Sequence, residues 1–388
     1  VKMKTITTTE ELAKFCYKCA SQPYVTVDTE FLRERTYYSQ LCLVQMAYPG
    51  KGDENAVIID PLADGIDLAP MYELFKNTDV VKVFHAARQD LEIFCIEGGV
   101  IPEPFFDTQI AAMVCGFGEQ VGYEKLVRQI VNESVDKSSR FTDWSRRPRS
   151  DKQKTYALAD VTHLRVIYEY LEKQLTKTDR TSWVTEEEAI LTDPATYRID
   201  PRNAWKRLKT RTTSGRFLAV VRELAQFREI TAQTRNIPRN RVIKDDALME
   251  LASNRPKSYE DLNRSRLLLR DARKGAIADG ILAAIKAGAA CPTEDLPIAP
   301  PVRAKKNGTE SLGDLLRVLL KSKAEKYRVA PKLIATSSDL DALANGDDDV
   351  VAALKGWRKD VFGDDALRLR NGEIALSASP KGVKIIEL

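Results

Sequence analysis

The stretch Val25-Thr26-Val27-Asp28-Thr29-Glu30-Phe31 runs from β-forming residues directly into two carboxylates placed two residues apart. Side chains alternate faces along a strand, so Asp28 and Glu30 project from the same face, about 7 Å apart along the backbone. Like charges at this spacing repel each other, and a hard cation such as Mg²⁺ or Mn²⁺ would relieve the repulsion. A solvated edge strand is the alternative, so the metal interpretation requires further acids to converge on this pair.

The composition indicates a soluble globular protein of two or three domains, because 43% of its 388 residues are hydrophobic and 30% are charged. No apolar run approaches the roughly 20 residues that span a bilayer, and the N-terminal residues lack the apolar core of a signal peptide. Six cysteines with mostly apolar neighbours and only two histidines argue against a zinc site or a histidine-based triad. We therefore expect reduced thiols, a cytoplasmic location and no membrane partner.

Charge is unevenly distributed along the chain. The segment 198–290 holds 21 Lys and Arg against 10 Asp and Glu, a net charge of +11, whereas the whole chain carries +4. A basic part joined to an acidic part suggests a surface that grips a polyanion beside a metal site. A solvated helical surface remains the alternative explanation.

Strands and helices alternate up to about residue 190, which predicts an α/β domain. Asp90 would lie in the first turns of a helix that follows a short apolar strand, where α/β sheets place ligands. Asp107 is expected to be the N-cap of the next helix. The predicted strands cover Tyr24–Phe31, Leu41–Tyr48, Ala56–Asp60 and Val80–Phe84.

A long helical pattern carries Tyr156 and Asp160 four residues apart, so both side chains share one face of an otherwise apolar helix. The basic segment 137–150 precedes this helix and contains two aromatic residues. Cations and stacking surfaces of this kind hold single-stranded nucleic acid. An ordinary loop anchored in the core by Trp144 explains the segment equally well.

Beyond Pro194 the pattern is helical, with helices expected at Arg216–Asn236, Lys244–Ala252, Ser258–Asn263 and Ser265–Ala289. Residues Ile237–Ala252 align without gaps on Val329–Ala344 at an offset of 92. The match indicates a duplicated helical module whose second copy is less basic. The nature of the chain after Gly372 is left open.

Asp28, Glu30, Asp90 and Asp160, with Tyr156, supply what a two-metal phosphodiester hydrolase requires. These residues lie in three motifs that resemble ribonuclease D, a family of the DEDD exonuclease superfamily with a tyrosine in its third motif. The motifs are Asp28-Thr29-Glu30-Phe31, His85-Ala86-Ala87-Arg88-Gln89-Asp90-Leu91-Glu92 and Tyr156-Ala157-Leu158-Ala159-Asp160-Val161. Further similar stretches are Arg35-Thr36-Tyr37-Tyr38, Ile59-Asp60-Pro61-Leu62, Asp107-Thr108-Gln109-Ile110 and Thr142-Asp143-Trp144-Ser145-Arg146-Arg147-Pro148.

The resemblance implies a ribonuclease H-like α/β exonuclease domain followed by two small all-α domains. The expected parts are residues 1–195 for the exonuclease domain, 196–290 for a first helicase-and-ribonuclease-D C-terminal (HRDC) domain, 291–308 for a linker, and 309–388 for a second, divergent HRDC domain.

The resemblance also implies a 3′→5′ exoribonuclease that trims tRNA precursors and other structured RNAs and releases 5′-mononucleotides. Two divalent ions, Mg²⁺ or Mn²⁺, would be held by Asp28, Glu30, Asp90 and Asp160, and Tyr156 would orient the attacking water. RNA is the expected partner, and we expect a monomer. A DNA 3′→5′ exonuclease and a catalytically silent nucleic-acid-binding protein are the alternatives, although all five motif residues are present.

Overall fold

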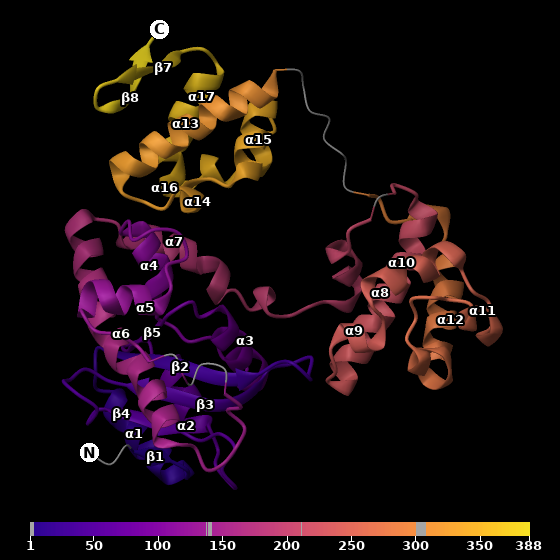
Figure 1. The fold of residues 1–388 in the computed structure, drawn as a ribbon, viewed down its shortest axis with the longest axis horizontal. Coiled ribbons are helices and arrows are strands. Elements are labelled where there is room, and N and C mark those ends of the chain that lie inside the picture. Colours follow the sequence, from indigo (N-terminus) through magenta and orange to yellow (C-terminus); the bar gives the residue numbers. More distant parts are fainter. Residues whose placement is uncertain (1–3, 137, 139–141, 211, 300–307) are drawn as a thin grey trace.

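The computed structural model describes residues 4–136, 138, 142–210, 212–299 and 308–388 (Figure 1). An α/β domain is followed by two helical modules. The elements of the first domain are β1 (Thr5–Ile6), α1 (Thr9–Cys19), β2 (Tyr24–Leu32), β3 (Gln40–Ala47), β4 (Ala56–Ile59), α2 (Ala69–Lys76), β5 (Val81–Phe84), α3 (Arg88–Glu97), β6 (Phe105–Asp107), α4 (Thr108–Val114), α5 (Tyr123–Leu126), α6 (Asp151–Thr178) and α7 (Thr181–Thr192). The four predicted strands are therefore present, with ends that differ by one residue in most cases.

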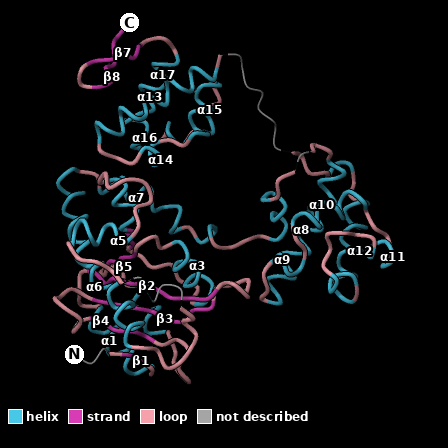
Figure 2. The backbone as a smooth tube through the Cα atoms, viewed as in Figure 1, coloured by secondary structure: helices cyan, strands magenta, loops and turns pink. Residues whose placement is uncertain are grey.

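The first domain is built around one six-stranded sheet with the order β1-β4-β3-β2-β5-β6 (Figure 2). Strands β2, β3 and β4 are antiparallel neighbours, whereas β5 and β6 continue the sheet parallel to β2. The register of β2 and β3 shifts between Glu30 and Phe31. Strand β2 thus lies at the junction between the antiparallel and parallel parts of the sheet.

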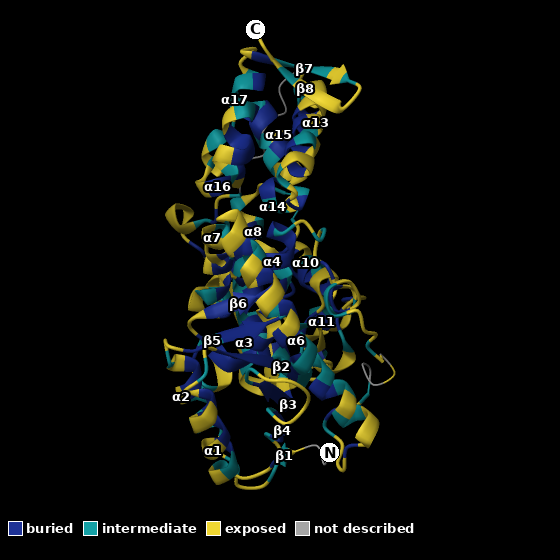
Figure 3. Ribbon diagram, turned by 90° about the vertical axis from the view of Figure 1, so that its left-hand side faces the viewer, coloured by how far each residue is buried: buried dark blue, intermediate teal, exposed yellow. Residues whose placement is uncertain are grey.

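Helices cover both faces of this sheet, and β2 contributes to both. Val25 and Val27 pack into the core beneath α1, α2 and α3. Thr26 faces the other side, where its hydroxyl donates to the carbonyl oxygen of Val161 on α6 at 2.8 Å. The strands are dark blue in the middle of the domain, whereas exposed residues lie on the outer sides of α1 and α2 (Figure 3). Asp28 and Glu30, in phase with Thr26, therefore face α6.

The two helical modules each have a separate hydrophobic core. The first contains α8 (Gly215–Arg235), α9 (Arg239–Val242), α10 (Asp245–Asn254), α11 (Tyr259–Asn263) and α12 (Gly275–Ala289). The second contains α13 (Thr309–Tyr327), α14 (Pro331–Ile334), α15 (Ser337–Asn345), α16 (Gly356–Arg358), α17 (Asp364–Arg370), β7 (Ile374–Ser379) and β8 (Gly382–Glu387).

The duplication predicted at an offset of 92 is visible in the structure. At this offset the end of α8 matches the end of α13, and both ends of α9 match those of α14. The start of α10 matches the start of α15. Asn236 and Arg328, which are equivalent at this offset, both cap a helix in the left-handed conformation. The two modules therefore share their first three helices.

One expected helix and the expected all-α character of the second module need revision. The helix expected at Ser265–Ala289 begins only at Gly275, because a 3₁₀ turn at Arg270–Arg273 and a left-handed Gly275 interrupt the segment. The chain after Gly372, left open above, forms the antiparallel hairpin β7–β8. The second module therefore ends in strands and is not helical throughout. Part of the expected linker, residues 300–307, lies outside the described residues.

The first module docks on the loop between β2 and β3 through Tyr37. The backbone N–H groups of Tyr37 and Tyr38 donate to Asn236 Oδ1 at 3.1 and 2.9 Å. The hydroxyl of Tyr37 contacts Glu229 and accepts from Arg239, whose guanidinium lies over the Tyr37 ring. The Arg35–Tyr38 stretch therefore serves as a docking arm for the first module.

The second module docks on α7. The rings of Trp183 and Trp357 stack at 4.4 Å with an interplanar angle of 11°. Trp357 and Arg358 both donate to the carboxylate of Glu187. In Figure 1 the second module accordingly lies against the end of the first domain that carries α4 and α7.

All six cysteines are free thiols, as predicted. No helix among the described residues is long and apolar enough to cross a membrane.

Candidate active site

Three of the predicted carboxylates meet on the α6 side of the sheet. Asp28 and Glu30 come from β2 and Asp160 from α6. One carboxylate oxygen from each lies within 4.8 Å of the others, which makes them a candidate metal-binding group. The alternation of side chains along β2 explains the pairing of the first two, and packing of α6 across β2 and β3 brings in the third.

Asp90 does not belong to this three-residue group. It lies on the first turn of α3 and is 7% exposed. The hydroxyl of Thr29 donates a hydrogen bond to Asp90 Oδ1. The charge of Asp28 also acts on Asp90, so this carboxylate lies close to the group although it is not one of its three members.

Mutual repulsion and burial dominate the electrostatics of the acids. Burial raises the pKa of Asp28 well above its ordinary value, and the neighbouring charge of Asp160 raises it further. Burial likewise raises the pKa of Asp90, and the charge of Asp28 adds to the effect. An oxygen-only donor set with unfavourable negative charge fits a divalent cation, which would favour the ionised carboxylates.

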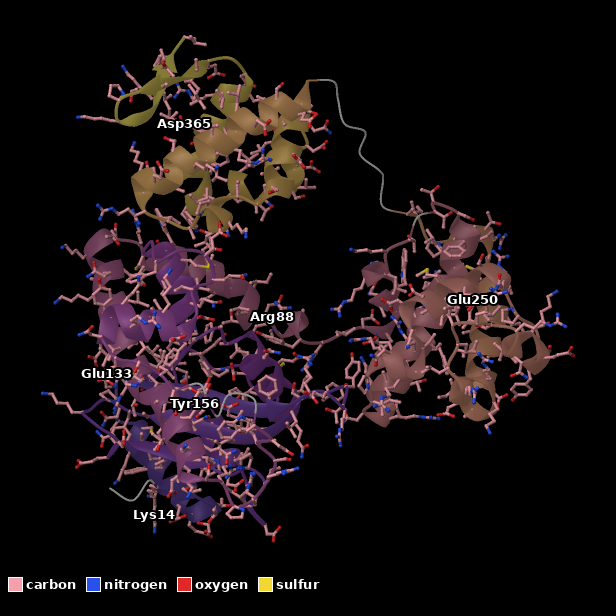
Figure 4. All side chains as sticks on the ribbon, in the orientation of Figure 1. Lys14, Arg88, Glu133, Tyr156, Glu250 and Asp365 are labelled. Atoms are coloured by element: carbon pink, nitrogen blue, oxygen red, sulfur yellow. The ribbon has the colours of Figure 1, made fainter. Side chains whose placement is uncertain are left out.

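Tyr156 lines the same cavity as Asp28, Glu30 and Asp160, with a volume of about 540 Å³. Its ring lies 6.1 Å from that of Trp144, which is 2% exposed and packs beneath α6. Figure 4 shows Tyr156 in the first domain, whereas Glu250 and Asp365 mark the two helical modules. The tyrosine is thus held from behind by a buried indole.

Asp107 fixes the turn that leads into α3. As predicted, it caps α4, accepting from Gln109 N at 2.7 Å. Its carboxylate also accepts from the N–H groups of Ala86 and Ala87, both at 3.0 Å. Its own N–H donates to the buried carboxylate of Glu188 on α7. Through Asp107, helix α7 therefore helps to position the helix that carries Asp90.

Sequence reasoning gave no role to four other residues that line the cavity: His85, Gln109, Tyr123 and Lys125. Tyr123 donates to the carbonyl oxygens of Ala159 and Asp160, both at 2.9 Å. Burial lowers the pKa of His85, whose Nδ1 lies 2.9 Å from Thr108 Oγ1. The position of His85 at the end of β5 was a usable signal, whereas Tyr123 follows a loop with no recognisable pattern.

The basic segment 137–150 is tied to the domain at two of its arginines, whereas Arg146 is exposed. Arg147 and Arg149 both pair with Asp60, and Arg149 is 8% exposed. Trp144 is buried, as the anchored-loop interpretation predicts. Residues 137 and 139–141 lie outside the described residues.

Comparison with known proteins agrees with this architecture. The sequence matches the family described as 3′-5′ exonuclease over residues 3–176 and the HRDC domain family over residues 217–285. A sheet domain that gathers three carboxylates beside a tyrosine, followed by an HRDC domain, defines a 3′–5′ exonuclease that depends on a divalent metal.

Relatives identify the particular family. Ribonuclease D of Jannaschia sp. is 64% identical over 384 residues, covering 99% of both chains. Ribonuclease D of Granulibacter bethesdensis is 50% identical, covering 98% of this chain and 96% of the relative. The crystal structure of Escherichia coli RNase D, described as an exoribonuclease involved in structured RNA processing, superposes with a TM-score of 0.82 at 27% identity, covering 96% of this chain and 99% of that chain.

The chain belongs to the ribonuclease D family. It is a 3′–5′ exoribonuclease, a hydrolase that acts on the phosphodiester bonds of RNA. The predicted α/β exonuclease domain followed by an HRDC helical domain is confirmed.

Proposed function

We propose that this exoribonuclease trims the 3′ ends of tRNA precursors and other structured RNAs by two-metal-ion hydrolysis and releases 5′-mononucleotides. The observation that carries the proposal is the convergence of Asp28, Glu30 and Asp160 beside Tyr156 in one cavity. The attached basic module supports a substrate with an extended, folded body. The domain division at residues 195, 290 and 308 is part of the same proposal.

We assign the four carboxylates as the metal ligands. Asp28 would be shared between two ions, and Glu30 and Asp160 would complete the site that holds the attacking water. Asp90 would serve the second ion through water, which suits a carboxylate that lies within reach of the Asp28 charge. Bound Mg²⁺ or Mn²⁺ supplies a nucleophilic water of lowered pKa and charge neutralisation at the phosphate.

Tyr156 would orient the attacking water rather than remove its proton. A phenol has a pKa near 10, so it is a poor general base at neutral pH. The buried Trp144 behind the tyrosine restricts its ring, which suits a positioning role. The catalytic group of the proposal is therefore Asp28, Glu30, Asp90, Asp160 and Tyr156.

The first helical module would hold the body of the RNA. Segment 198–290 carries a net charge of +11, and phosphate contacts of this kind weaken steeply with salt. Docking through Tyr37 keeps that basic surface attached to the catalytic domain. We further propose a cytoplasmic monomer, because trimming one end at a time requires no second copy.

The test is digestion of a 3′-extended tRNA transcript in Mg²⁺ beside a DNA oligonucleotide of the same 3′ sequence. Stepwise release of mononucleotides from RNA alone, lost in Asp28→Asn, is the expected result. Comparable attack on the DNA would support the DNA exonuclease instead. RNA binding without cleavage of either substrate would indicate a silent binding protein.

A further inference from the structure

A groove of about 720 Å³ lies where the second module meets the first domain. One wall comes from the first domain, from the segment Cys115–Gly118 and the C-terminal half of α6. The other wall comes from the end of α13 and the residues that follow it. We call this feature, lined by residues from 115 to 118, 170 to 180 and 321 to 331, the junction groove. The catalytic site described above does not include it.

The junction groove is basic. Its lining includes Arg180, Lys321, Lys326 and Arg328 against a single carboxylate, that of Glu325. Lys321 and Arg328 are exposed, and their side chains have no ion-pair or hydrogen-bond partner among the described residues. Two unneutralised cations facing one hollow are suited to an anion.

Aromatic rings lie among these cations. Tyr327 lies beneath the ammonium group of Lys326, 5.4 Å from the ring centre. On the opposite wall Phe117 and Tyr170 make an edge-to-face pair with centroids 6.1 Å apart. Cations interleaved with aromatic surfaces are the combination that binds single-stranded nucleic acid.

The two walls are held together by fixed contacts. The N–H of Ala330 donates to the carbonyl oxygen of Met113 at 3.0 Å, and Lys332 pairs with Glu119 at 2.8 Å. The stacked Trp183–Trp357 pair holds the modules together beside the groove. The groove therefore exists before a ligand arrives, which lowers the entropic cost of binding.

Helix α6 connects the groove to the catalytic site. Tyr156 and Asp160 line the catalytic cavity, whereas Tyr170, Gln174 and Thr178 line the groove. At 100° and 1.5 Å per residue, Gln174 lies on nearly the same side of α6 as Asp160, about 21 Å further along. In Figure 1, α6 extends from beside β2 and β3 towards the second module.

A second connection runs alongside that helix. The segment from Cys115 to Gly118 lines the groove, and the segment from Gly122 to Lys125 lines the catalytic cavity. Lys125 Nζ lies 4.0 Å from the position that a Cβ atom on Gly118 would take. The ammonium group of Lys125 thus lies between the junction groove and the catalytic cavity, where it could contact a phosphate backbone that runs from one to the other.

We infer that the junction groove binds the phosphodiester backbone of the RNA substrate upstream of the 3′ end that occupies the catalytic site. At 3.4 Å per stacked nucleotide, 21 Å corresponds to about six nucleotides. The second module, although less basic than the first, then supplies Lys321 and Arg328 as phosphate contacts. The inference rests on the exoribonuclease activity and adds a second contact region to it.

The experiment compares Lys321→Gln/Arg328→Gln with a control, Lys381→Gln/Lys384→Gln, which removes the same charge from the hairpin of the same module. Each full-length protein is assayed on a 3′-extended tRNA transcript and on an RNA tetranucleotide, which is too short to reach the groove. The salt dependence of transcript binding is measured in parallel.

The groove variant should raise KM for the transcript about tenfold with kcat unchanged. The slope of the logarithm of the binding constant against the logarithm of the salt concentration should be shallower by about 1.4, as expected for two lost phosphate contacts on a single strand. The tetranucleotide and the control should behave like the parent protein. Unchanged transcript binding would overturn the inference, and so would equal losses on the tetranucleotide or in the control.

Discussion

The hydroxyl of Thr29, which lies between Asp28 and Glu30 on β2, donates a hydrogen bond to the carboxylate of Asp90. The stretch from Asp28 to Glu30 therefore supplies two of the proposed metal ligands and a hydrogen bond to a third, Asp90. Two of its side chains face α6, and the third holds the remaining acid in place. In the proposed mechanism, Thr29 is therefore a positioning residue for Asp90.

Replacing Thr29 tests this role. Thr29→Val keeps the shape of the side chain but leaves a buried carboxylate without its donor, a loss that costs about 1–3 kcal/mol. We expect the Mg²⁺ concentration for half-maximal activity to rise, while Thr29→Ser restores it. An unchanged Mg²⁺ dependence in Thr29→Val would show that the hydrogen bond does not position Asp90 for the metal.

Tyr156→Phe distinguishes positioning from proton abstraction. Removal of a water-orienting hydroxyl should lower kcat by about 10- to 100-fold and leave KM nearly unchanged, since general-base catalysis contributes more. The pH–rate profile should keep its shape. If Tyr156 were the base, the rise in rate as pH approaches its pKa would disappear in Tyr156→Phe.

Asp60 supplies a stability prediction with a defined pH range. Burial of Asp60 works against ionisation, but hydrogen bonds and charge from Arg147 and Arg149 outweigh it and lower its pKa to about 2. A carboxylate with a lowered pKa stabilises the folded protein at pH values above its ordinary pKa, near 3.9, and this contribution is lost as pH falls towards 2. Asp60→Asn should therefore lower the free energy of unfolding by about 2 kcal/mol at neutral pH. In urea unfolding, the difference in free energy of unfolding between the variant and the parent protein should shrink below pH 4. A difference that stays constant with pH would contradict the ion-pair explanation.

Glu188 should behave in the opposite way. Burial raises the pKa of Glu188 well above its ordinary value, so the ionised form is disfavoured in the folded protein. A raised pKa contributes stability at low pH that is lost as pH rises. Glu188→Gln keeps an acceptor for the N–H of Asp107 and should gain in Tm relative to the parent protein as pH rises from 4 to 8. A gain that does not change with pH would argue against ionisation as the cause.

Local patterns were sufficient for four of the six strands of the first domain and for four members of the site. Strand alternation pairs Asp28 with Glu30, and helical spacing pairs Tyr156 with Asp160, so both pairs could be predicted without a structure. The metal-ligand roles of these residues remain a proposal. The capping role of Asp107 could also be predicted from the sequence, because a short polar residue precedes an apolar helix.

Other features depend on contacts between distant segments. Arg147 and Arg149 looked available for RNA because their partner, Asp60, is more than 80 residues away in the chain. The contact between Tyr37 and the first helical module could not be predicted from the sequence, because its partners Glu229 and Arg239 belong to another domain. The helix expected at Ser265–Ala289 was too long because left-handed Gly275 ends the irregular turn before α12.

The most direct test of the central claim is a crystal structure with Mn²⁺ and a bound mononucleotide, in which anomalous scattering locates the metal ions. The proposed mechanism predicts two metal peaks that share Asp28, one beside Glu30 and Asp160 and the other on the Asp90 side. A single peak, or metal bound away from Asp28, would contradict two-metal hydrolysis at this site.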